Sequence, residues 1–281
     1  MTPFKRILLA IVMAMAMTPT ALSQIVSDYY SKFNADSIRT DFRDQPYFGL
    51  YKDNYFIFGP PIGHKPTASN TNIKFQISLG VRLTNATLPF GTYLHLFYTQ
   101  KVFWNILENS MPMTDLNFNP GIGLTKPLFV KNRYVGKVAL LVEHESNGRD
   151  SIQSRSWNKI SLAANIIIDP NIMVHGKVWI PIIDGQNNKD ILNYCGIYEV
   201  GLQALTDNRK FTSSVTLVKR KGWKPNYNVI LDFAYRFSTK YNWYFYAQYY
   251  NGYGEGLLDY NKHTSQLRLG IVFKPNLFSD F

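Results

Sequence analysis

Several stretches of this chain alternate between apolar and polar residues, and this pattern limits the possible folds more than any other feature. The clearest example runs from Asn72 to Leu83, where every second residue from Ile73 onward is apolar and the intervening ones are polar or glycine. The segments 229–237 and 266–273 repeat the pattern. Because successive side chains of a β-strand point to opposite faces, each segment predicts a strand with one apolar and one polar face. The pattern therefore predicts an all-β protein.

Two architectures would produce such strands. A soluble β-sandwich alternates because its apolar faces are buried between two sheets. A membrane barrel alternates because its apolar face meets lipid, and its strands need about ten residues to cross a bilayer at a tilt. The alternating segments have this length, and aromatic residues crowd strand ends, as in Tyr241–Tyr253, which is typical of interfacial girdles. The chain also finishes at Phe281, similar to the aromatic terminal signal of bacterial outer-membrane barrels. These features favour the barrel.

Counting candidate segments gives about twelve strands, an even number that lets antiparallel strands close without an exposed edge. They centre near residues 52, 78, 97, 125, 139, 163, 175, 199, 214, 231, 246 and 269. No linker rich in Pro, Gly or Ser divides the chain. We therefore expect a twelve-stranded antiparallel transmembrane β-barrel of the outer-membrane type. It forms a single domain over residues 24–281, with 24–45 as a polar lead-in.

The first 23 residues predict a secretory signal peptide. Lys5 and Arg6 precede an apolar run, Ile7–Met17, and the stretch Ala21–Ser23 provides a small-x-small cleavage site. An exported barrel of this kind is expected in the bacterial outer membrane as an integral, multi-pass protein.

The composition excludes several other classes of protein. A single cysteine among 281 residues excludes a disulfide scaffold and a zinc site built on several thiolates. The net charge of +11 comes from basic residues that look scattered and form no basic arm, so we expect no nucleic-acid binding. Such charges suit a polar lumen or loops near anionic lipid headgroups. By strand phase Glu143 and Glu145 face the lumen, where we expect them to pair with Lys137 and Lys159.

The candidate chemistry lies in two adjacent segments, Glu143–Arg149 and Ser154–Asn158. His144 and Ser146 share a strand face with Leu140 and Val142, and Asn158 shares one with the apolar residues that follow it. The three polar side chains therefore fall in the lipid-facing register at the same end of two neighbouring strands. Polar groups that face hydrocarbon are costly without partners, so a cluster of three is expected to be mutually satisfied and to meet a lipid substrate.

Their roles follow from ordinary hydrolase chemistry. A serine hydroxyl becomes a strong nucleophile when an adjacent imidazole takes its proton, which assigns Ser146 as nucleophile and His144 as base. Asn158 can accept a hydrogen bond from the other imidazole N–H and so hold its tautomer. The alternative is that His144 only anchors the strand end at the membrane interface, because a lone H-x-S motif has little specificity.

The same segments resemble the outer membrane phospholipase A family, which consists of calcium-dependent lipid hydrolases. The central block reads H-E-S-N-G-R at 144–149 and S-R-S-W-N at 154–158. A second block is Y-T-Q-K at 98–101, followed by Asn117 and Pro120, and a third runs from Gly252 to Asn261. The resemblance implies a twelve-stranded barrel with Ser146 as nucleophile, His144 as base and Asn158 as orienting residue.

The resemblance also implies an oxyanion site and a metal. The Gly148 amide and a bound Ca²⁺ would stabilise the oxyanion, within a homodimer that holds two calcium sites when active. The implied ligands are the Arg149 carbonyl, the Ser154 hydroxyl, Ser110 of the second copy and, outside the dimeric site, Asn187 in place of an acidic residue. The loop aspartate of the family is replaced by Ser151. Gln100 matches a polar residue of the family's dimer interface. A hydrogen bond between two such glutamines in lipid is worth about 1 kcal/mol.

The sequence therefore predicts a calcium-dependent phospholipase A1/A2 that is activated by dimerisation. Its substrates would be the sn-1 and sn-2 acyl esters of phospholipids and lysophospholipids. The alternative is a catalytically inactive structural or pore-forming outer-membrane barrel that keeps the motif without turnover.

Overall fold

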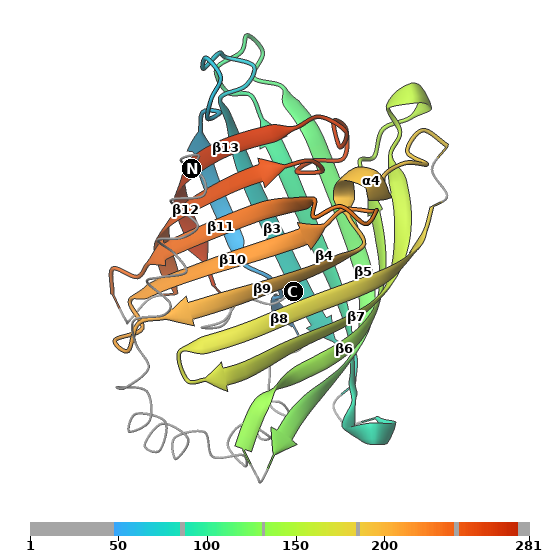
Figure 1. Ribbon diagram of the computed structural model, residues 1–281, viewed down its shortest axis with the longest axis vertical. Helices are drawn as coiled ribbons and strands as arrows, with labels where there is room; N and C mark the ends of the chain where they lie inside the picture. Colours follow the sequence, from blue (N-terminus) through green and yellow to red (C-terminus); the bar gives the residue numbers. More distant parts are fainter. Residues whose placement is uncertain (1–47, 85–87, 131–132, 184–185, 239–241, 275–281) are drawn as a thin grey trace.

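The computed structural model describes residues 48–84, 88–130, 133–183, 186–238 and 242–274. In this part of the chain, antiparallel pairing joins each strand from β2 to β13 with the next, and β13 pairs with β2 to close a barrel (Figure 1). The strands are β2 (Asn54–Gly59), β3 (Asn72–Arg82), β4 (Tyr93–Trp104), β5 (Met113–Val130), β6 (Arg133–Ser146), β7 (Ser156–Asp169), β8 (Ile172–Ile182), β9 (Tyr198–Leu205), β10 (Phe211–Lys219), β11 (Tyr227–Tyr235), β12 (Trp243–Gly252) and β13 (Thr264–Phe273).

These twelve strands confirm the predicted architecture. The short strand β1 (Phe48–Leu50) precedes β2 in the chain and pairs with the same strand, β3. Together β1 and β2 form the first barrel strand, with an interruption between them. The remaining short elements are η1 (Pro89–Gly91), η2 (Ser151–Gln153) and α4 (Leu192–Cys195). Among the described residues, no helix has the length and apolarity needed to cross a bilayer. The predicted signal peptide, the lead-in 24–45 and the terminal Phe281 lie outside the described residues.

The barrel is polar inside and apolar outside, which excludes the soluble sandwich. In β13, Leu267, Leu269 and Ile271 are 38%, 61% and 37% exposed, whereas Gln266 and Arg268 are 4% and 2% exposed. A sandwich would bury the leucines and expose the arginine. An outward apolar surface requires hydrocarbon around it, so the exposure pattern is that of a transmembrane barrel.

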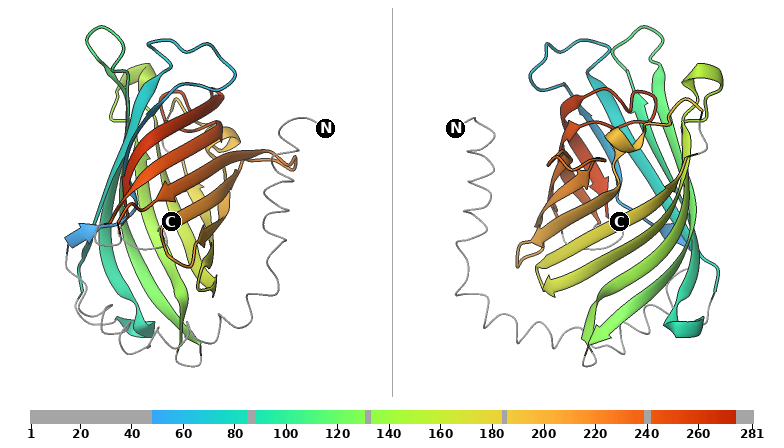
Figure 2. Two further views of the ribbon diagram at one scale, coloured as in Figure 1. Left: turned by 90° about the vertical axis from the view of Figure 1, so that its left-hand side faces the viewer. Right: turned by 45° about the vertical axis from the view of Figure 1, so that its right-hand side comes forward.

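The two rims of the barrel differ in the length of their connections (Figures 1 and 2). At one rim, β5 and β6 are separated only by 131–132, and β7 and β8 only by 170–171. At the other rim the connections after β2, β4, β6, β8 and β12 are longer. In bacterial outer-membrane barrels the short turns face the periplasm and the long loops face outward. We therefore call the rim that carries the β6–β7 loop the outer rim.

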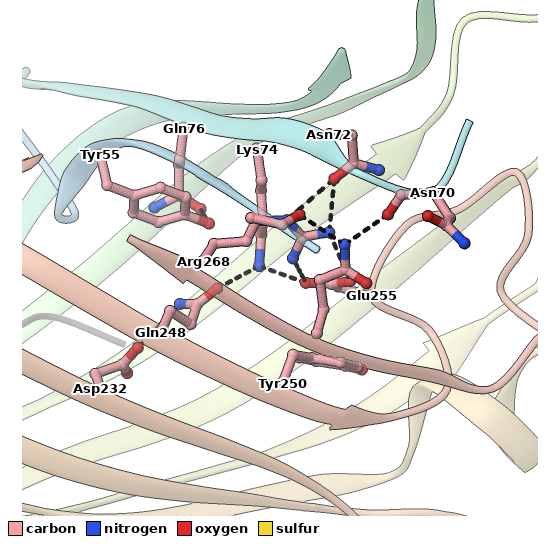
Figure 3. A network of polar contacts seen from close by, with 12 residues as sticks. Tyr55, Asn70, Asn72, Lys74, Gln76, Asp232, Gln248, Tyr250, Glu255 and Arg268 are labelled. Carbon is pink, nitrogen blue, oxygen red and sulfur yellow. Dashed lines mark hydrogen bonds and ion pairs between the residues drawn. The ribbon is translucent and has the colours of Figure 1, made fainter. Parts of the chain in front are cut away.

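A buried ionic cluster lies inside the barrel, where the β12–β13 loop meets β3 and β13 (Figure 3). Glu255, from the β12–β13 loop, contacts the Lys74 ammonium at 3.1 Å and the Arg268 guanidinium at 2.7 Å. Lys74 also donates to Gln248 at 2.6 Å, and Arg268 donates to Asn72 at 2.9 Å. We call Lys74, Glu255 and Arg268 the lumen septum. Glu255 lines both an inner cavity of about 360 Å³ and an outer cavity of about 400 Å³, so the septum lies between them.

A second set of lumen ion pairs corrects one sequence prediction. Glu145 pairs with Lys159 at 2.9 Å, as expected. Glu143 pairs instead with Lys177 of β8 at 2.8 Å. Lys137 lies opposite Asn165 in the β6–β7 register, whereas Glu143 lies opposite Lys159. Lys137 is therefore six residues from Glu143 along β6, about 20 Å at the rise of a β-strand, too far for an ion pair.

The septum predicts a specific loss of stability for Glu255→Gln. Burial raises the pKa of Glu255, but the Arg268 and Lys74 charges outweigh burial and lower it from 4.5 to about 2. A depressed folded-state pKa stabilises the fold fully above the ordinary value and progressively less as the pH falls toward 2. Removing the charge leaves two buried cations uncompensated, so we expect the free energy of unfolding at neutral pH to fall by about 3–5 kcal/mol.

Urea unfolding in detergent micelles between pH 2 and 7 measures this difference. Asp259→Asn is the matched control, because it makes the same chemical change in the same loop at an exposed pair with Lys262, where the loss should stay below about 1 kcal/mol. Equal losses for the two variants, or a gap that persists unchanged to pH 2, would contradict the role of the septum.

Candidate active site

Strand register brings the predicted catalytic residues together on adjacent strands. His144 of β6 lies directly opposite Asn158 of β7. Their side chains are joined by a hydrogen bond of 2.8 Å between His144 Nδ1 and Asn158 Oδ1. Because an amide oxygen can only accept, this contact assigns the proton to Nδ1. In the neutral imidazole, Nε2 then carries no proton and is available as a base.

The site faces outward, toward lipid. Leu140 and Val142, which share the phase of His144, are 48% and 49% exposed, and Leu162, in the phase of Asn158, is 58% exposed. The three candidate residues are themselves half-buried. The predicted phase is therefore confirmed for both strands, and the cluster lies where the lipid-facing wall reaches the outer rim.

Ser146 is the last residue of β6, on the same face as His144. Among the described contacts no hydrogen bond joins its hydroxyl to His144. Catalytic hydrogen bonds are often long in a substrate-free enzyme and shorten when substrate binds. The serine–histidine contact therefore stays a prediction, while the histidine–asparagine contact is present.

The loop after Ser146 is held by Asn147, a residue that the sequence reasoning passed over. Asn147 is 3% exposed. Its Nδ2 donates to the Gln153 carbonyl at 2.8 Å, and its Oδ1 accepts from the amides of Arg155 at 3.0 Å and Arg149 at 3.3 Å. The only available signal was the Asn-Gly pair that follows the strand, which is a common turn sequence.

Gly148 follows in a conformation that requires glycine. Its φ is +63°, in the left-handed region. A Cβ at this position would lie 2.7 Å from the Phe118 ring. Both the backbone conformation and the close approach therefore exclude a side chain. The hydrogen bonds of Asn147 hold the loop that carries the Gly148 amide, which is the predicted oxyanion donor.

The same loop carries two of the predicted calcium ligands. The Arg149 guanidinium donates to the Thr114 carbonyl and to Gln153 Oε1, both at 2.6 Å, and so ties the loop to the start of β5. Ser154 follows η2 and is half-buried. This arrangement leaves the Arg149 carbonyl and the Ser154 hydroxyl as oxygen donors in one loop.

The two other predicted ligands lie in separate outer-rim loops. Asn187 reaches the β6–β7 loop, because its Nδ2 donates to the Ser151 carbonyl at 2.8 Å and leaves its amide oxygen as a donor. Ser110 is exposed in the β4–β5 loop, with a φ of +69°. Among the described residues, no group of three or more His, Cys, Asp or Glu side chains could hold a metal. Neutral hydroxyl, carbonyl and amide oxygens nevertheless fit calcium, which prefers oxygen ligands.

Gln100 lies on the same outward face as the catalytic cluster. It pairs with Ile77 of β3 and with Phe118 of β5, and Phe118 in turn lies opposite Ser146. Ile77 is 46% exposed, so this row of side chains faces lipid. Tyr98 donates to Gln100 Oε1 at 3.1 Å. Polar groups that face hydrocarbon are costly, and a polar partner on a second molecule would lower this cost for Tyr98 and Gln100.

The comparisons with known proteins show the family and the fold of this chain. The family model for phospholipase A1 matches residues 52–273. The chain belongs to the phospholipase A1 family. Phospholipase A1 of Proteus vulgaris is 29% identical over 216 residues, covering 73% of this chain and 70% of the relative. Phospholipase A1 of Escherichia coli K12 is 29% identical over 215 residues, with the same coverage.

Solved structures of this family share the fold. Outer membrane phospholipase A from Escherichia coli aligns with a TM-score of 0.72 at 25% identity, covering 84% of this chain and 95% of that one. The Salmonella typhi outer membrane phospholipase dimer with bound calcium aligns with a TM-score of 0.73 at 24% identity, covering 87% and 99%. The expected family, fold and location are thereby confirmed: the protein is an integral outer-membrane barrel of a phospholipase A1 family of hydrolases.

The hydrogen bonds of Asn147 predict that this residue positions the family's active-site loop. Asn147→Ala removes three side-chain contacts that hold the loop around Gly148. Misplacing a catalytic group by about 1 Å costs about 100-fold in rate. We expect kcat for phospholipid hydrolysis to fall by about that factor while the barrel remains folded. The control is Asn193→Ala, at an exposed asparagine of α4 at the same rim. An unchanged kcat for Asn147→Ala would contradict the assignment.

Proposed function

We propose that this protein hydrolyses the sn-1 and sn-2 acyl esters of phospholipids and lysophospholipids on the lipid-facing wall of its barrel. The observation that carries the proposal is the 2.8 Å hydrogen bond between His144 and Asn158 in the outward register. Two polar side chains that pair with each other at a hydrocarbon surface, next to an outward-facing serine, form a hydrolase constellation at the place where a lipid ester would lie.

Ser146 is the proposed nucleophile. His144 Nε2 removes the hydroxyl proton as the serine oxygen attacks the ester carbonyl carbon, and the carbonyl π electrons move to oxygen. Asn158 holds the Nδ1–H tautomer and the ring orientation throughout. The imidazolium then gives its proton to the departing lysophospholipid alkoxide, which leaves an acyl-serine. Water, deprotonated by His144, releases the fatty acid and restores the serine.

The Gly148 amide is the proposed oxyanion donor. A fixed N–H aimed at the position where negative charge develops is often the largest electrostatic contribution to such a reaction, worth about 3–4 kcal/mol for one donor. The left-handed turn at Gly148 and the anchoring contacts of Asn147 support this role, because both limit movement of the amide.

Calcium and dimerisation are proposed as the control of the site. The Arg149 carbonyl, the Ser154 hydroxyl and Ser110 of a second copy would hold Ca²⁺, two ions per homodimer, with Asn187 as a further oxygen ligand. Bound calcium supplies positive charge beside the oxyanion. The Salmonella typhi relative, whose structure is a dimer with bound calcium, supports this part of the proposal. Gln100 would face its counterpart across the dimer interface, where the Tyr98–Gln100 pair gains a polar partner.

The alternative of a pore-forming barrel has less support. A pore needs a continuous aqueous path, whereas Lys74, Glu255 and Arg268 of the lumen septum lie buried inside the barrel, at 4%, 5% and 2% exposure. The septum separates the inner cavity from the outer one. An inactive barrel would also have no need of the tautomer-fixing contact on its lipid face.

Fatty-acid release from phospholipid micelles by the refolded full chain tests the proposal. Ser146→Ala should lower release by a factor of at least 10⁴ while the protein stays folded, because the residual rate comes from binding and oxyanion stabilisation alone. Ser213→Ala is the control, since Ser213 lies near the start of β10, on a different wall of the barrel.

Chelation separates the parts of the proposal. Loss of release in both the variant and the chelated wild type supports the triad and calcium together. Release that survives chelation but not the mutation would retain the triad and contradict the calcium assignment. If folded wild type releases nothing at any calcium concentration, the structural or pore-forming barrel replaces the hydrolase.

A further inference from the structure

A cluster of basic residues surrounds an exposed tryptophan in the β10–β11 connection. The segment Lys219–Lys224 contains Lys219, Arg220, Lys221 and Lys224, and no acidic residue occurs between Asp207 and Asp232. The basic residues are therefore less scattered than the sequence analysis indicated. Trp223 is fully exposed, at 104%. We call residues 220–226 the basic loop.

The basic loop lies at the outer rim. In an antiparallel barrel every second strand ends at the same rim, so β10 ends at the rim where β6 ends and the active site lies. Figure 2 shows the β10–β11 connection projecting from the barrel wall. The loop is six strands around the barrel from β4, which carries Gln100. A ring of twelve strands places it on the opposite wall, so a homodimer through Gln100 leaves it free.

The basic loop is built as a rigid platform rather than a mobile tip. The Lys219 ammonium, on a side chain of a residue 7% exposed, donates to the Gly222 carbonyl at 2.8 Å and to Asn226 Oδ1 at 2.6 Å. The Arg220 guanidinium packs 4.7 Å from the Tyr253 ring centre. The Lys221 amide donates to the Leu192 carbonyl at 3.0 Å.

Lys219 and Arg220 therefore hold the loop in place, whereas the other two cations of the segment are exposed to solvent. Lys221, Trp223 and Lys224 are all exposed. Lys221 and Lys224, which flank Trp223 in the sequence, suit a phosphorylated lipid at a membrane interface, where tryptophan is enriched and lysines are attracted to an anionic surface.

We propose that the basic loop binds the phosphate groups of lipopolysaccharide in the outer leaflet. The loop is at the outer rim, and the phosphate monoesters of this glycolipid each carry a charge of about −1.5 to −2 at neutral pH. Lys221 and Lys224 pair with these phosphates, and Trp223 lies among the sugars and upper acyl chains. This contact anchors the wall of the barrel that faces away from the dimer interface.

Titration of the refolded full chain with purified lipopolysaccharide tests the proposal. The protein has five tryptophans, so the signal of Trp223 is taken as the difference between wild type and Trp223→Phe. We expect its emission to shift to the blue on binding. The double substitution Lys221→Gln/Lys224→Gln should raise the Kd roughly tenfold or more, since two lysine contacts are lost.

The matched control is Lys65→Gln/Lys262→Gln, which removes the same charge from two exposed lysines of other outer-rim loops. Fatty-acid release and heat-modifiable migration in electrophoresis check that both double variants are folded. An unchanged Kd for the basic-loop variant, or an equal loss in the control, would overturn the site. Equally tight binding of phosphatidylglycerol vesicles would overturn the choice of lipopolysaccharide and leave a loop that binds any anionic surface.

Discussion

The structure depends on the requirement that a chain in hydrocarbon satisfy every backbone hydrogen bond internally. Closure of β13 onto β2 meets this requirement, because no strand of the ring keeps an unpaired edge. Once the sheet is closed, strand alternation divides the side chains into an apolar outer surface and a polar lumen. Polar residues on the outer surface are then costly unless they have partners or a function. His144, Ser146 and Asn158 are polar residues of this kind.

The same closure determines how the site is assembled. Register between β6 and β7 places His144 opposite Asn158 without any contribution from the lumen. The lumen in turn is filled by ion pairs such as Glu143–Lys177 and by the septum. The Glu143–Lys177 pair ties β6 to β8 from inside the barrel, and the hydrogen bonds of Asn147 hold the loop at the rim. The proposed catalytic residues therefore lie on the paired strands β6 and β7, of which β6 is tied from the lumen, and they face lipid.

Much of the fold could be predicted from the sequence, because alternation is a local property. Twelve strands and the outward phase of His144 follow from the period of two, which needs no knowledge of distant partners. The partner of Glu143 did not follow, since Lys177 belongs to a strand that is not adjacent to β6. The septum was equally hidden: Glu255 and Lys74 are 181 positions apart and meet only because a loop folds into the lumen.

The catalytic residues could be proposed from chemistry and phase, and the family resemblance extended them to calcium and dimerisation. The anchoring role of Asn147 could not be seen, because its partners depend on the path of the loop. The basic loop had a visible signal in its charges, but only the structure separates the buried Lys219 from the exposed Lys221 and Lys224. Burial, rather than residue type, decides which cation holds the loop and which one is displayed.

The central claim is that a nucleophilic serine faces lipid. The most direct measurement is labelling of the membrane-embedded protein with a long-chain alkyl sulfonyl fluoride, followed by peptide mass spectrometry. We predict a single modified residue, Ser146, that reacts faster with the long-chain reagent than with a short, water-soluble one. Modification of another serine, or faster reaction with the water-soluble reagent, would contradict a lipid-facing active site.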